Sequence, residues 1–225
     1  MGGKKNGRMQ VVKGSFGDIF RSYKNERIKL EKYQIVGILL LIVVIAGFIG
    51  WVYEAVFYFF DGGAEKFYMQ GGNFLPWINI YAIGALLILL ATWKMRKKPW
   101  MVFLAAVFLT GALELVAGWL VYTFGNGTRY WDYNQEILNF GNIGGFVCLR
   151  SVLVFGISAL FLMYVVVPVL IWMARRMPRR GFLVLAVMLF SLVLLDEAIN
   201  LILKNLDMPT AMDFYKSLGL EYKNF

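Results

Sequence analysis

Long uncharged apolar runs constrain this chain more than any other feature. A helix rises 1.5 Å per residue, so roughly 20 apolar residues suffice to cross a hydrocarbon layer of ~30 Å. Continuous runs of that length argue against short alternating barrel strands. We therefore predict an all-α, polytopic transmembrane helical bundle with five spans. The runs are Ile35–Phe60, Leu75–Trp93, Trp100–Phe124, Val152–Trp172 and Gly181–Leu203.

Basic residues collect on one side of the predicted bundle. Of the 23 Lys and Arg, nine precede Ile35, and the second-to-third and fourth-to-fifth connections carry four each. Because cytoplasmic segments are enriched in Lys and Arg, the N-terminus is predicted inside and the C-terminus outside. The chain then divides into a basic cytoplasmic segment (1–34), a transmembrane helical domain (35–203) and an outer C-terminal segment (204–225).

Both terminal segments contain apolar residues at helical spacing. In the first, the pattern predicts an interfacial helix lying in the lipid headgroups, although a loosely ordered basic arm is an equal alternative. Its apolar positions are Val12, Phe16, Ile19, Phe20 and Tyr23, and its basic positions are Lys13, Arg21, Lys24 and Arg27. In the last, Pro209–Tyr222 could form a short outer helix with Met212, Tyr215 and Leu218 on one face.

The composition excludes several kinds of site. The chain has no His and one Cys, Cys148, which excludes a His-ligated zinc, a His general base, an intrachain disulfide and a cysteine-cluster metal site. We expect no cofactor and no metal. The net charge of +9 fits contact with anionic membrane lipid, so no nucleic-acid partner is expected. No P-loop is present, and ATP-driven work would need a separate ATPase.

Four carboxylates lie inside the apolar runs: Glu54, Glu114, Asp196 and Glu197. An ionised carboxylate in hydrocarbon is costly unless it finds water, a partner or a proton, which makes each a candidate functional residue. Three of them lie roughly 9 to 15 Å from the outer ends of their spans. With Arg150 at the same side, we expect one outward-facing acidic cavity. The alternative is that each acid hydrogen-bonds a polar neighbour and only fixes helix packing.

Further candidates surround these acids. Asn200 shares a helix face with Asp196, whereas Glu197 points about 100° away and could instead face Lys204. Backbone N–H groups at the start of the fourth span, with Arg150, could receive an anion, although a simple glycine turn is slightly favoured.

The connection 125–151 also carries Trp131, Asp132 and Tyr133. These residues could form an amphipathic lid over the cavity. Trp131 and Tyr133 could equally belong to the interfacial aromatic belt, which leaves Asp132 unexplained.

A series of short motifs runs through the membrane part in a fixed order. It comprises Gly50–Glu54, then Pro76, Tyr81 and Gly84, then Glu114, then Trp131–Tyr133, then Gly145–Leu149 with Ser151 and Gly156. Over about residues 40–200 this order resembles the bacterial membrane proteins called the putative ABC-transporter type IV family.

The resemblance implies a multi-pass protein of the bacterial inner or plasma membrane, an outward Trp-Asp-Tyr loop and importance for Glu54 and Glu114. Tyr81 joins the candidate binding residues. One departure is Gly145-Phe146-Val147, where a Gly-Arg-Ile step is expected. Arg150 would replace that charge, or an anion-related role is absent.

Three functions are compatible with these features. The leading one is membrane transport or binding of a polar or cationic solute or lipid headgroup. Five spans are few for a pathway, so a homodimer or a partner membrane subunit would complete it. The second is a membrane-embedded enzyme acting on a lipid-linked substrate with two carboxylates as acid and base, although no nucleophile motif is present. The third is a non-catalytic assembly or sensor subunit.

Overall fold

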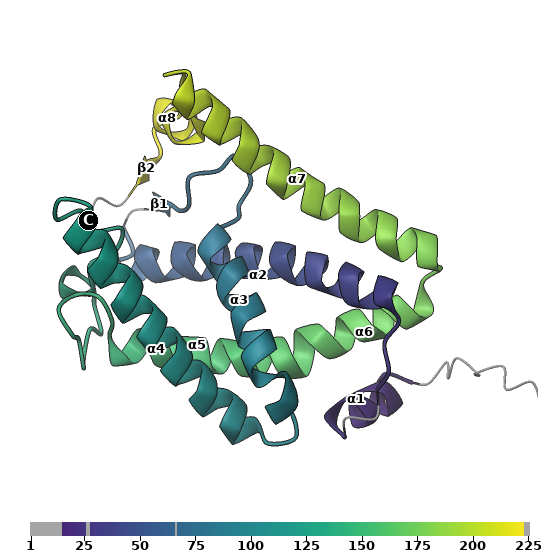
Figure 1. Ribbon diagram of the computed structural model, residues 1–225. Coiled ribbons are helices and arrows are strands. Elements are labelled where there is room, and N and C mark those ends of the chain that lie inside the picture. Colours follow the sequence, from purple (N-terminus) through teal and green to yellow (C-terminus); the bar gives the residue numbers. More distant parts are fainter. Residues whose placement is uncertain (1–14, 26–27, 66, 223–225) are drawn as a thin grey trace, which may run out of the picture.

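The computed structural model describes residues 15–25, 28–65 and 67–222, and they form an all-α bundle, as predicted (Figure 1). Two-residue strands β1 (Tyr68–Met69) and β2 (Glu221–Tyr222) pair in parallel. The helices are α1 (Phe16–Lys24), α2 (Lys32–Asp61), α3 (Asn79–Thr92), α4 (Pro99–Phe124), α5 (Leu149–Phe161), α6 (Val167–Arg176), α7 (Arg179–Asn205) and α8 (Ala211–Ser217).

Within the described residues, four helices are long and apolar enough to cross a membrane: α2, α4, the continuous α5–α6 rod and α7. They make the chain a multi-pass membrane protein. The remaining predicted span is shorter, because α3 begins at Asn79 rather than near Leu75 and ends in a 3-10 turn at Met95. Pro76 has no N–H, and the N–H groups of Phe74 and Leu75 bond to the Asp196 carboxylate instead of starting a helix.

The fourth predicted span is one rod with a wider turn in its middle. A π-helical segment, Leu162–Val166, joins α5 to α6. Pro168 follows it and lacks the N–H that would bond to the carbonyl of Tyr164, and a π-turn relieves this misfit. The rod therefore continues to Arg176, beyond the predicted end at Trp172.

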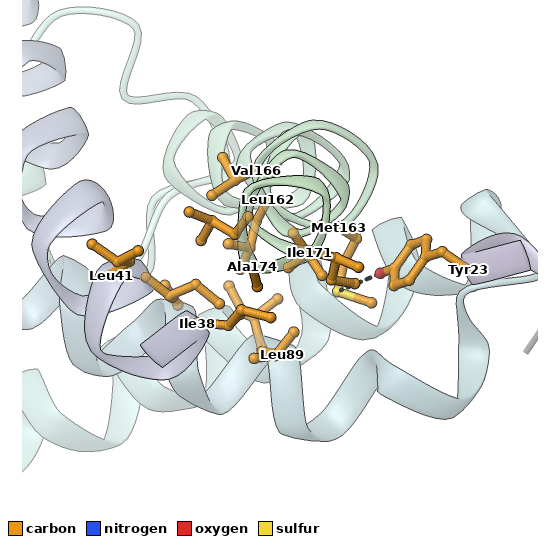
Figure 2. Packing of buried hydrophobic residues seen from close by; sticks show 14 of the residues in the cluster. Tyr23, Ile38, Leu41, Leu89, Leu162, Met163, Val166, Ile171 and Ala174 are labelled. Carbon is orange, nitrogen blue, oxygen red and sulfur yellow. Dashed lines mark hydrogen bonds between the residues drawn. The ribbon is translucent and has the colours of Figure 1, made fainter. Parts of the chain in front are cut away.

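The main core lies where α1, α2, α3 and α6 meet. Ile42, Met163 and Ile171 are fully buried within it. Figure 2 shows Ile38 and Leu89 packed around the α5–α6 rod, with the Tyr23 hydroxyl donating to Met163 Sδ at 3.9 Å. On the other side of α2, α7 packs along the helix (Figure 1).

The N-terminal helix is present from Phe16 to Lys24. Ser15 caps its first turn, accepting from the Asp18 N–H while the Asp18 carboxylate accepts from the Ser15 N–H. Ile19 and Tyr23 are buried against the bundle, whereas Phe16 is exposed. Much of the apolar face is therefore covered by protein, and a position in the headgroups stays a prediction. Val12, Lys13 and Arg27 lie outside the described residues.

The C-terminal segment contains the expected helix, shortened to α8. It lies beside the end of α7 and the two strands (Figure 1). The Tyr215 hydroxyl donates to the Phe74 carbonyl at 2.7 Å, while Met212 and Leu218 are exposed. The predicted apolar face is thus only partly used, and the segment packs on the connection between α2 and α3.

Candidate functional site

Charged and hydroxyl side chains gather at one end of the bundle. There the C-terminal halves of α2 and α4 meet the start of α5 and the connection between α4 and α5 (Figure 1). Four helices and that connection contribute side chains to this cluster. We call this set the acidic network: Tyr53, Glu54 and Tyr58 of α2, Tyr81 of α3, Glu114 of α4, Tyr133 and Glu136 of the connection, and Arg150 and Ser151 of α5.

An ion pair between Arg150 and Glu136 forms its centre. Arg150 Nη2 donates to one carboxylate oxygen, and the Tyr58 hydroxyl donates to the other at 3.0 Å. The guanidinium lies over the Phe57 ring, 3.9 Å from its centroid, and donates to the Tyr53 hydroxyl at 3.3 Å. The two charged residues are only 8% and 5% exposed. Burial raises the pKa of Glu136, and the Arg150 charge opposes that rise, so the carboxylate depends on its partner.

Glu114 is held from two directions. The Ser151 hydroxyl on α5 donates to one of its oxygens at 2.7 Å, and the Tyr133 hydroxyl donates to the other. Burial and the neighbouring Glu114 charge raise the pKa of Tyr133, so its phenol keeps the proton that it donates. Glu114 therefore ties α4 to both α5 and the connection.

Glu54 reaches the network through Tyr81. Gly50 lets this tyrosine approach α2, since a Cβ there would lie 2.2 Å from the Tyr81 ring. The Tyr81 hydroxyl interacts with the Glu54 carboxylate. Glu54 also lies close enough to Glu136 for their charges to interact. The network thus contains three carboxylates and one guanidinium, that of Arg150, which pairs with Glu136.

The acids on α7 belong to a different group. Asp196 accepts from the backbone N–H groups of Phe74 and Leu75, at 3.1 and 2.8 Å. Glu197 accepts from Asn73 Nδ2 at 3.1 Å, rather than pairing with Lys204 in the described structure. The structure therefore does not bring these acids together with Glu54 and Glu114.

Asn200 completes that second group. Its amide nitrogen donates to Asp196 Oδ1 at 3.2 Å, and its carbonyl oxygen accepts from the Ala211 N–H at 2.9 Å. The group on α7 therefore anchors both the 62–78 connection and the C-terminal segment.

Trp131 and Asp132 shape the connection that covers the network. Trp131 Nε1 donates to the Phe146 carbonyl at 2.9 Å. Asp132 is buried and accepts from the Asn134 backbone N–H and side-chain amide, at 3.1 and 2.7 Å. These bonds fix the turn from which Tyr133 and Glu136 point to their partners.

The members of the network contact one another directly, and the expected acidic cavity stays a prediction. A pocket of about 370 Å³ lies elsewhere and has an apolar lining. In the described part of the chain, no three His, Cys, Asp or Glu side chains are close enough to hold a metal ion.

Glu136 is the main residue of the network that sequence reasoning missed. It lies in a connection, where an acid is normally solvated, so hydropathy gives it no weight. One signal was available: Arg150 begins a span and needs a partner, and Glu136 is an acid of the preceding connection.

A comparison with protein families supports the resemblance in the motifs. The family model described as Putative ABC-transporter type IV matches residues 41–201, a range that includes the acidic network and the acids of α7. No curated protein and no solved structure matches the chain.

Proposed function

We propose that this chain, which belongs to the putative ABC-transporter type IV family, binds a cationic group at the acidic network. The group is carried by a polar solute or a lipid headgroup, and the protein moves it as the membrane component of a transporter. The observation that carries this proposal is the excess of carboxylates in the network: Glu54, Glu114 and Glu136 lie there with one guanidinium, that of Arg150, which pairs with Glu136. Excess buried negative charge is stabilised by a bound cation or by protons.

The residues of the network have different roles in this proposal. Glu54 and Glu114 supply the negative charge, and Tyr81 and Tyr133 orient their carboxylates. Arg150 holds Glu136, and with it the connection that covers the site. Because Tyr133 and Glu136 both come from that connection, its displacement opens the site as a cavity.

The other candidate residues position the site rather than contact the ligand. Trp131 and Asp132 hold the fold of the covering connection, and Asp196, Glu197 and Asn200 hold the 62–78 connection against α7. Support comes from their partners, which are backbone groups or amides of those connections.

We propose five membrane crossings, with the acidic network facing outward in a bacterial cell membrane. The support is charge segregation: the connections after α3 and α6 are basic, and the network lies at the opposite ends of α2, α4 and α5. On a Cys148→Ser background, an impermeant thiol reagent added outside should label Lys216→Cys and not Lys94→Cys. The reverse pattern would reject this orientation.

Additional subunits complete the transporter in this proposal. Four long helices and the shorter α3 are few for a translocation path, so a second copy or another membrane subunit contributes to it. ATP-driven movement requires a separate ATPase, since the chain has no P-loop.

The experiment is a thermal-shift series on the purified full-length protein with ethanolamine, choline and spermidine at constant ionic strength. A ligand that binds only the folded state raises the melting temperature. We expect at least one of these cations to do so, and expect Glu54→Gln and Glu114→Gln to lose the shift while remaining folded. Glu197→Gln is the matched control and should keep it. Folded Gln variants with an unchanged shift would defeat the proposal.

A further inference from the structure

We infer that an anionic phospholipid occupies an apolar groove at the basic end of the bundle. The groove has a volume of about 370 Å³ and lies between residues 28–30, the first turns of α2, the last turns of α3 and the first turns of α6. Its floor includes Ile38, Leu89 and Ile171, which Figure 2 shows close together around the rod. This site lies away from the acidic network and does not depend on the function proposed above.

The shape of the groove suits an acyl chain that enters from the side. Val167 and Ile171 at the bottom are 1% and 0% exposed, whereas Ile35 and Leu90 at the rim are 43% and 72% exposed. The opening therefore faces the outside of the bundle, where lipid surrounds a membrane protein. The volume is in the range of small-molecule sites.

The chemistry of the lining excludes water as a stable occupant. The groove is lined by Ile, Leu and Val side chains with Trp93 at one end. A water molecule needs two or more polar partners to be held in a cavity, and an apolar lining offers hydrocarbon contact instead. An empty groove would forgo those dispersion contacts, which an acyl chain supplies.

Charge beside the groove selects the headgroup. Lys29 lies between two lining residues, Lys32 lies three residues before Ile35, and Lys94 follows Trp93. All three lysines are exposed, and within the described residues none of them forms an ion pair. Within residues 28–35 the one acid, Glu31, is accompanied by two lysines, Lys29 and Lys32, and Lys94 adds a third positive charge.

A basic residue near a membrane surface strengthens the binding of anionic lipid by about fivefold. Phosphatidylglycerol is therefore favoured over phosphatidylcholine, which carries the same acyl chains and no net charge.

The test is native mass spectrometry of the full-length protein in mild detergent, titrated separately with dioleoyl phosphatidylglycerol and dioleoyl phosphatidylcholine. We expect one tightly bound phosphatidylglycerol and at least tenfold weaker binding of phosphatidylcholine. Ile35→Trp places an indole in the groove and should weaken phosphatidylglycerol binding at least tenfold. Val36→Trp changes the next residue, which does not line the groove, and should bind as the wild type does.

Two further variants keep the test decisive. Leu90→Trp, at a more exposed rim position, should reproduce the loss if Ile35→Trp fails to fold. The triple change Lys29→Gln, Lys32→Gln and Lys94→Gln should make the two lipids bind equally. Equal binding of both lipids to the wild type, or unchanged binding to the folded Trp variants, would overturn the inference.

Discussion

The ion pair between Glu136 and Arg150 gives the sharpest prediction about stability. Glu136→Gln keeps an acceptor for the Tyr58 hydroxyl but removes the charge opposite Arg150. Arg150 is 8% exposed, so its guanidinium would stay buried without a counter-charge. Breaking a buried pair in this way costs about 3–5 kcal/mol, which for a chain of this size lowers the melting temperature by roughly 6–20 °C.

A double-mutant cycle separates the pair from other effects of the substitutions. Arg150→Met alone should cost a similar amount, because it leaves Glu136 buried without its cation. Combining the two should restore stability to within about 1–2 kcal/mol of the wild type, since no uncompensated charge remains. The free energy of unfolding would be measured by titrating a denaturing detergent into the protein held in a mild detergent. Glu65→Gln is the exposed control. Single variants that lose less than about 1 kcal/mol, or losses that simply add, would refute the reasoning.

Three further predictions test the packing and the anchors of the site. Gly50→Ala should destabilise the protein by about 1–3 kcal/mol in thermal unfolding, because the added Cβ would meet the Tyr81 ring. Gly84→Ala is the control and should not destabilise it, since the space around Gly84 is open. Equal losses of stability in the two variants would contradict the close approach of Tyr81 to α2. Asp196→Ala should increase proteolysis of the 62–78 connection, since two backbone N–H groups lose their acceptor. Ser191→Ala serves as the exposed control. Unchanged cleavage of Asp196→Ala would argue against Asp196 as the anchor of that connection. Hydrogen bonds from Thr210 lower the pKa of Asp213 below its ordinary 3.8, so its stabilisation of α8 is present above pH 3.8 and is lost as the pH falls through the folded pKa. Amide exchange in α8 should therefore quicken in that acidic window, and Asp213→Asn should remove the pH dependence; a wild-type pH response retained in that variant would exclude Asp213 as its source.

Hydropathy was enough to predict the helices but not their full extents. The apolar runs gave α2, α4 and α7 with ends displaced by a few residues, because a long uncharged run in a membrane has little alternative to a helix. The start of α3 was missed, since it depends on Asp196, a residue more than a hundred positions away that binds the intervening backbone. Long-range hydrogen bonds of this kind leave no periodic signal.

The candidate site was predicted in part. Glu54, Glu114 and Arg150 stood out because charge is rare inside apolar runs, and the structure places them in one network. Glu136 did not stand out, since an acid in a connection is normally solvated. Asp196 was expected beside Glu54 and Glu114 from its depth alone. Depth along a helix does not specify which neighbour a side chain faces, and that depends on packing of α7 against α2.

The claim at the centre of this account is that the acidic network binds a cation through its charge. The most direct measurement is equilibrium dialysis of a radiolabelled cation, chosen from the thermal-shift series, against purified wild type, Glu114→Gln and Glu197→Gln. The amide keeps the size and an acceptor of the carboxyl group but cannot ionise. We predict at least tenfold weaker binding to Glu114→Gln and unchanged binding to Glu197→Gln. Equal affinity of all three proteins would contradict the account.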